Sequence, residues 1–130
     1  MKLLLDIGNT HTMAALSTRG RVGKVLEFST DKWPRPRILQ KIIGKQKLTD
    51  TACCSVVPAA TKLAKALCPA PFSTLTHANC GIDLRYPKPA TIGPDRLANA
   101  RAALDEVGGP VLVVDFGTAV TFDIIDDSGA

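Results

Sequence analysis

The chain has 130 residues, enough for one domain with a hydrophobic core and too few for two of ordinary size. Hydrophobic residues make up 45% and charged residues 22%, a balance that excludes a disordered chain. The net charge of +4 suits an anionic ligand and does not distinguish a nucleotide from a nucleic acid.

Hydrophobic periodicity predicts strands and helices in turn along the chain. Apolar and β-branched runs indicate strands, and apolar positions three or four residues apart indicate helices. The expected strands cover residues 2–7, 12–17, 22–28, 51–57, 72–76, 111–114 and 119–125. The expected helices cover residues 34–43, 59–67 and 95–107, with Pro34 and Pro36 in the first turn of the first helix. This order indicates an α/β fold with a mixed sheet.

The apolar stripes of the later helices predict their buried faces. The stripe of the second helix consists of Leu63, Ala66 and Leu67, and that of the third of Leu97, Ala100, Leu104 and Val107. The third helix is expected to end at Gly108.

Targeting and redox signals are few. The apolar run that begins at Leu3 is broken by Asp6, far short of a signal or membrane segment, so we expect a cytoplasmic protein with no membrane partner. None of the four cysteines forms a C-x-x-C pair, and we interpret Cys53, Cys54 and Cys68 as small buried apolar residues.

The first candidate site follows the first strand. Asp6 ends that strand and Gly8 follows it, so backbone N–H groups lie where no Cβ obstructs a phosphate, and the carboxylate can hold a hydrated Mg²⁺. Thr10, Thr12 and the backbone of His11 extend this donor surface. The alternative is a turn that only closes a hairpin.

A second copy of this pattern follows the most hydrophobic strand of the chain, which we expect to be its most buried. Asp115, Gly117, Thr118 and Thr121 repeat the arrangement, with a further carboxylate at Asp123. Two such loops facing each other across a cleft could hold a nucleoside triphosphate from both sides. The repetition suggests a duplication whose second copy has only begun.

The third candidate site lies at the start of the last helix. Gly93 and Pro94 position that start, Asp95 lies in its first turn, and Arg96 offers a planar fork for a carboxylate or phosphate. A carboxylate that can remove a hydroxyl proton, beside a carboxylate-binding arginine, is typical of an acceptor site for a hydroxy acid. The alternative is a helix cap.

Four motifs in this order resemble type III pantothenate kinases over nearly the whole chain: DIGNT at 6–10, SVVP at 55–58, YPKPATIGPDR at 86–96 and DFGTAVTFD at 115–123. The resemblance implies a ribonuclease H-like (actin-like ATPase) fold. Residues 1–110 would form the N-terminal lobe, with a mixed five-stranded sheet flanked by helices. Residues 111–130 would begin an incomplete second lobe.

The resemblance also implies an activity. These kinases use ATP to phosphorylate the terminal hydroxyl of pantothenate to 4'-phosphopantothenate, the first step of coenzyme A biosynthesis. They need Mg²⁺ and a monovalent cation, K⁺ or NH₄⁺, and usually form homodimers; no nucleic acid is involved.

Site residues carry over only where the motifs match. The implied ATP-binding residues are Asp6, Ile7, Gly8, Asn9, Thr10, His11, Thr12, Met13 and Thr118. The implied pantothenate-binding residues are Tyr86, Gly93, Pro94, Asp95 and Arg96, with Asp95 as the general base. Asp115 would bind the monovalent cation, and Asp6 would bind Mg²⁺ through the phosphates.

Three alternatives to this kinase activity stay open. A ribonuclease H-like nuclease would gather Asp6, Asp115 and Asp123 around metal ions, but would leave the glycine-threonine loops and the Gly93–Arg96 segment without a role. A non-enzymatic transcriptional accessory factor of the same family, and an actin-like kinase with another acceptor, are the others. Members of the family are about twice as long, so we expect these 130 residues alone not to turn over pantothenate and to expose apolar surface.

Overall fold

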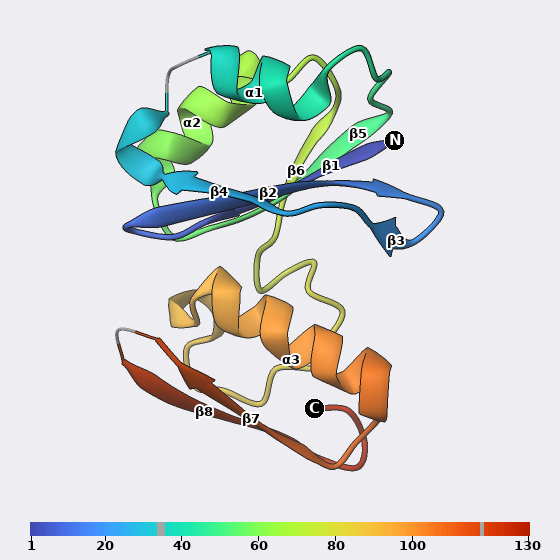
Figure 1. Cartoon of the computed structure of the whole chain (residues 1–130). Helices are drawn as coiled ribbons and strands as arrows, with labels where there is room; N and C mark the ends of the chain where they lie inside the picture. The colour runs from blue at the N-terminus through green and yellow to red at the C-terminus, as the bar shows by residue number, and fades with distance from the viewer. Residues whose placement is uncertain (34–35, 118) are drawn as a thin grey trace. The chain divides into compact units, whose positions relative to one another are not determined.

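The computed structural model describes residues 1–33, 36–117 and 119–130, with Pro36 described by its backbone alone (Figure 1). The chain divides into two compact units, Met1–Thr74 and Leu75–Ala130. The division into lobes at residues 110 and 111 stays a prediction.

A mixed sheet forms the centre of the first unit, as predicted. Its strands are β1 (Lys2–Ile7), β2 (His11–Thr18), β3 (Arg21–Val22), β4 (Leu26–Ser29), β5 (Asp50–Ser55) and β6 (Phe72–Thr74). The order is β3-β2-β1-β5-β6, and β4 also pairs with β2. β1 runs antiparallel to β2 and parallel to β5, which is itself parallel to β6. The connection from β5 to β6 is a crossover through a helix, as parallel neighbours require.

The described part of the sheet has six strands where five were expected, because the predicted strand at 22–28 is interrupted. Ser17 pairs with Val22 and Ala14 pairs with Leu26, so three residues, 23–25, lie opposite two, 15 and 16. This surplus of one residue is a β-bulge. The N–H of Gly23 still donates to the Leu16 carbonyl at 2.8 Å, which keeps the edge strand attached across the interruption.

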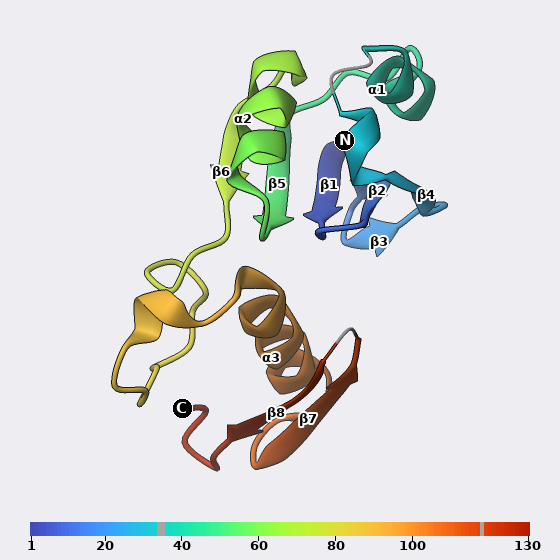
Figure 2. The same cartoon turned by 90° about the vertical axis from the view of Figure 1, so that its left-hand side faces the viewer.

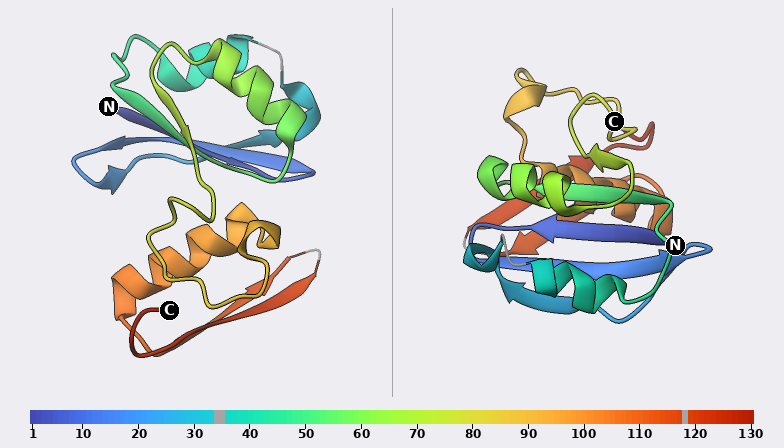
Figure 3. Two further views of the ribbon diagram at one scale, coloured as in Figure 1. Left: turned by 180° about the vertical axis from the view of Figure 1, so that it is seen from behind. Right: turned by 90° about the horizontal axis from the view of Figure 1, so that it is seen from above.

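Two helices, α1 (Pro36–Ile43) and α2 (Pro58–Leu67), lie over the same face of this sheet in the described part of the unit (Figures 1 and 3). Each begins at a proline, where the missing N–H costs no hydrogen bond. Pro34, also expected in the first turn of α1, lies outside the described residues. Beneath the helices, alternate residues of β1 are almost fully buried. They are Leu3, Leu5 and Ile7.

The predicted buried face of α2 is wrong. Leu63 and Ala66 are exposed, and the buried positions are Ala60 and Ala64, with Leu67 partly buried. Figure 2 shows α2 alongside β5. Small side chains allow the helix to approach the strand closely, so the alanines rather than the larger Leu63 face the sheet.

The second unit consists of a short 3-10 helix η2 (Pro89–Thr91), helix α3 (Pro94–Val107) and an antiparallel hairpin of β7 (Val111–Phe116) and β8 (Val120–Ile125). Leu97, Ala100 and Ile125 are buried in it. Gly108 ends α3 as predicted, with φ of 76° and its N–H donated to the Leu104 carbonyl. Val107 does not belong to the buried stripe, because it lies in the final turn and is 72% exposed.

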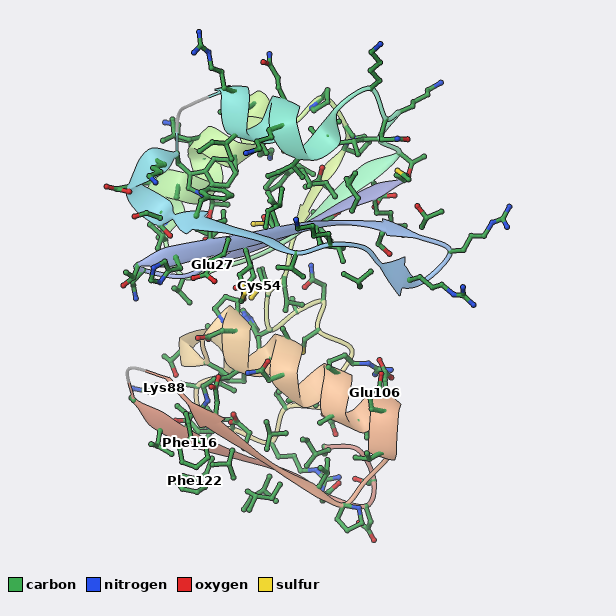
Figure 4. All side chains as sticks on the ribbon, in the orientation of Figure 1. Glu27, Cys54, Lys88, Glu106, Phe116 and Phe122 are labelled. Carbon is green, nitrogen blue, oxygen red and sulfur yellow. The ribbon has the colours of Figure 1, made fainter. Side chains whose placement is uncertain are left out.

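The β7–β8 hairpin has one covered and one exposed face. The expectation that residues 111–114 form the most buried strand is therefore wrong, and the most buried strand is β1. Strand pairing places Val113, Asp115, Thr121, Asp123 and Ile125 on one face. The opposite face carries Leu112, Phe116, Val120, Phe122 and Ile124, all exposed. Figure 4 shows Phe116 and Phe122 on the side of the hairpin away from α3. The expected exposed apolar surface is therefore found here.

All four cysteines are free thiols, and their burial differs from the prediction. Cys53 is buried as expected, while Cys54 and Cys68 are only partly buried; Cys80 is buried in the second unit. Burial, and then the charges of Cys68 and Asp6, raise the pKa of the Cys53 thiol to about 12. A thiol this resistant to ionisation is a poor nucleophile and metal ligand, which supports a packing role. No helix among the described residues is long and apolar enough to span a bilayer.

Candidate functional site

The turn between β1 and β2 is held by hydrogen bonds within the first unit. The N–H of Gly8 donates to the His11 carbonyl at 2.9 Å. A Cβ at Gly8 would lie 3.0 Å from that same carbonyl oxygen, so the turn leaves little room for a side chain. Thr30 binds both sides of the turn: its hydroxyl donates to the Gly8 carbonyl at 2.7 Å, and its N–H donates to the Thr10 carbonyl at 2.8 Å.

A buried chain of hydrogen bonds leads into this turn. Trp33 Nε1 donates to Thr12 Oγ1 at 3.0 Å, and Thr12 Oγ1 lies 3.1 Å from Thr30 Oγ1. Because the one hydroxyl hydrogen of Thr30 is directed at Gly8, Thr12 is the donor to Thr30. The order of donation therefore runs from the indole through two hydroxyls to the Gly8 carbonyl, and it fixes the shape of the turn.

This arrangement separates the residues predicted around the ATP phosphates into two groups. Ile7 and Thr12 are fully buried, and the Thr12 hydroxyl is engaged inside the protein, so its expected place on the donor surface is wrong. The exposed residues of the turn are Asn9, Thr10, His11 and Met13, and Asp6 is partly buried at the end of β1. Ile7 and Thr12 support the turn from the buried side, and the exposed residues form its solvent-facing surface.

The start of α3 arranges the second unit's candidate acid. Gly93 is the N-cap residue, Pro94 begins the helix, and the Arg96 N–H donates to Asp95 Oδ1 at 2.9 Å. A Cβ at Gly93 would clash with Asp95 Oδ1. The Asp95 carboxylate thus folds back over a glycine and stays exposed, partly satisfying the helix N-terminus as a cap would.

The Arg96 side chain is fixed by the hairpin. Its Nε donates to both carboxylate oxygens of Asp123, at 3.0 and 3.2 Å, and its Nη2 makes a close hydrogen bond to Asp123 Oδ1. The pKa of Arg96 is raised, mainly by the hydrogen bond to Asp123 and then by the charges of Asp123, Tyr86 and Asp95. Burial acts in the opposite direction. Tyr86, half exposed, therefore lies within electrostatic range of the guanidinium.

Asp115 lies on the same hairpin face as Asp123 and is held by the same helix. Asn99 Nδ2, one turn after Arg96, donates to Asp115 Oδ2 at 3.0 Å. Directly across the strand pair lies Thr121, whose buried Oγ1 has no hydrogen-bond partner among the described residues. A carboxylate and an unsatisfied hydroxyl oxygen are ligands that suit a hard cation, so these residues fit the expected monovalent-cation site. Thr118 lies outside the described residues.

Sequence reasoning missed the supporting residues. It assigned no role to Thr30, Trp33 or Asn99, and it left Asp123 without a partner. The signal for Asn99 is its spacing of three from Arg96, which puts both on one face of a helix. The signal for Asp123 is its alternation with Thr121 and Ile125 along β8.

Replacing Gly93 by Ala is expected to displace the Asp95 carboxylate while leaving the fold intact. The backbone φ of −60° at Gly93 suits alanine, so the clash falls on the carboxylate. The carboxyl carbon resonance of Asp95 should shift in the NMR spectrum, while the free energy of unfolding changes by less than about 1 kcal/mol. Gly117→Ala is the control, because its Cβ would meet nothing closer than 3.7 Å. An unmoved Asp95 resonance in G93A would contradict the steric argument.

The fold and these side chains define an α/β protein with a mixed, helix-flanked sheet, whose aspartates lie at strand ends and at a helix start. The family model for type III pantothenate kinase matches residues 2–130. The chain therefore belongs to the type III pantothenate kinase family.

Individual relatives agree with this assignment. The chain is 33% identical to a type III pantothenate kinase of Agathobacter rectalis, over 99% of this chain and 55% of that protein. It is 33% identical to one of Thermomicrobium roseum, over 100% of this chain and 56% of the relative. The chain is 37% identical to a type III pantothenate kinase of Methylacidiphilum infernorum, over 98% of this chain and 47% of the relative. The chain spans about half the length of the curated relatives it matches.

Proposed function

We propose that the protein to which these residues belong transfers the γ-phosphate of ATP to the terminal hydroxyl of pantothenate, in the cytoplasm, as the first step of coenzyme A biosynthesis. Membership of the type III pantothenate kinase family supports this activity. The observation that carries it in the structure is the exposed carboxylate of Asp95 beside Arg96 at the start of α3. The family match does not favour the nuclease or regulatory alternatives.

The acceptor side of the reaction needs a carboxylate anchor and a base. Arg96 offers its guanidinium to the carboxylate of pantothenate, and Gly93, Pro94 and Tyr86 line the same site. Asp95 accepts the proton of the attacking hydroxyl as the oxygen–phosphorus bond forms and ADP leaves. The exposed position of Asp95 and its attachment to the helix N-terminus allow it to meet a ligand without rearrangement of the helix.

The donor side is assigned to the β1–β2 turn. The surface residues Asn9, Thr10, His11 and Met13 would border the phosphates, with Gly8 permitting close approach of the backbone. Ile7 and Thr12 act by holding the turn. Asp6 would share a Mg²⁺ ion with the phosphates, and Thr118 would contact ATP. Bound Mg²⁺ neutralises charge that develops on the transferred phosphoryl group.

Asp115 is the proposed ligand of a monovalent cation, K⁺ or NH₄⁺, with Thr121 as a further oxygen. Its hydrogen bond to Asn99 leaves the second carboxylate oxygen to face the cation. We also propose that the intact protein is a homodimer.

The test of the activity is ADP release by the intact protein, given ATP and Mg²⁺, with and without pantothenate. Release should require pantothenate and should be much faster in potassium or ammonium than in sodium at equal ionic strength. Folded protein that releases no ADP in response to pantothenate would overturn the proposal. Pantothenate-dependent release that is equal in all three salts would overturn only the cation assignment.

A further inference from the structure

We infer that Asp123 is the positioning residue of the acceptor site: it holds one edge of the Arg96 guanidinium so that the other edge faces the carboxylate of the substrate. This inference rests on the proposed function, because it assigns the partner of Arg96 from the acceptor chemistry. Asp123 itself touches no reacting atom; it acts through Arg96.

The hydrogen-bond pattern shows which edge of the Arg96 guanidinium is occupied by Asp123. A guanidinium carries five N–H groups in a plane. Asp123 receives the Nε hydrogen and one hydrogen of Nη2, which together form the side edge of the fork. The two Nη1 hydrogens and the second Nη2 hydrogen remain, and among the described residues none of them is hydrogen-bonded. That free end edge has the geometry for a second bidentate carboxylate.

The position of Asp123 is itself well determined. It lies on β8 opposite Val113, two residues before Ile125, which is only 2% exposed. The Asp123 side chain is 17% exposed and that of Arg96 is 32% exposed. A long arginine side chain at a surface would otherwise sample many rotamers, and fixing it in advance reduces the entropy lost when the ligand binds.

Helix α3 also contains an arginine–aspartate ion pair, Arg101 with Asp105, that lies outside the proposed acceptor site. Arg101 Nε donates to Asp105 at 3.0 Å, and Arg101 Nη2 makes a close hydrogen bond to the same carboxylate. This pair is local, four residues apart, and both side chains are largely exposed. It reproduces the side-edge geometry without a place in the acceptor site, so Asp105→Asn is the control for Asp123→Asn.

The experiment compares the steady-state kinetics of the intact protein in wild-type form and in both variants. Asp123→Asn keeps the shape of the side chain and removes its charge, so the KM for pantothenate should rise about tenfold to a hundredfold. The KM for ATP should stay within about twofold, since Asp123 orients only the acceptor anchor. Asp105→Asn should change neither constant. An unchanged pantothenate KM in Asp123→Asn, beside an active wild type, overturns the inference.

A double-mutant cycle with Arg96→Lys separates positioning from general loss of structure. If Asp123 acts through Arg96, adding Asp123→Asn to Arg96→Lys should raise the pantothenate KM by less than about twofold more. Multiplied effects of the two substitutions would overturn the inference. Should Asp123→Asn fail to fold, Asp123→Glu replaces it in the same comparison, with an expected rise in KM and a normal melting curve. A wild type that does not use pantothenate overturns the proposed function and this inference together.

Discussion

Asp95→Asn is expected to lower the kcat of the intact protein for pantothenate phosphorylation by about 10²- to 10⁴-fold, the usual contribution of a general base. The amide keeps the shape of the carboxylate and can still accept the Arg96 N–H, which Asp95 Oδ1 now receives at 2.9 Å. What it cannot do is take a proton from the attacking hydroxyl. The KM for ATP should therefore change little while kcat falls.

The control for Asp95→Asn is Glu106→Gln, another exposed carboxylate on the same helix. Figure 4 shows Glu106 near the C-terminal end of α3, far along the helix from residue 95. The kcat of Glu106→Gln should remain within about twofold of the wild type, as expected for a surface substitution away from the site. A kcat for Asp95→Asn within about threefold of the wild type would remove Asp95 from the role of base.

Ile7→Ala is expected to lower the free energy of unfolding by about 2–5 kcal/mol, the range for loss of a fully buried aliphatic side chain. Ile7 has no exposed surface and belongs to the core between the sheet and its helices. The substitution leaves a cavity directly beneath the β1–β2 turn. Urea denaturation followed by circular dichroism measures the change from the shift of the midpoint.

Met13→Ala is the matched control, because Met13 lies across the β1–β2 pair from Asp6 and is 44% exposed. Met13→Ala should lower the free energy of unfolding by less than about 1 kcal/mol. Ile7 and Met13 both belong to the segment predicted to bind ATP. The comparison of the two variants distinguishes the buried residue that stabilises the turn from the exposed residue on its surface. Equal losses of stability in Ile7→Ala and Met13→Ala would contradict the division of the turn into support and surface.

Most strand positions and the family could be predicted from the order of residues alone. β1 is recognisable because Leu3, Leu4 and Leu5 form an apolar run that ends at Asp6 and Gly8. The start of α1 follows from the tolerance of proline in a first turn, whereas the helix expected at 59–67 begins one residue earlier, at Pro58. The family follows from motifs of local chemistry, such as the glycine that leaves room for the Asp95 carboxylate.

The partners of the site residues depend on contacts that no local pattern encodes. Arg96 and Asp123 are 27 positions apart, and they meet only because α3 packs against the covered face of the hairpin. The chain of hydrogen bonds from Trp33 to Gly8 likewise joins distant segments. In α2, the packing distance to the sheet selects the face with Ala60 and Ala64 over the one with Leu63. Periodicity identifies the element, whereas the rotation of a helix and the register of a strand pair are set by packing.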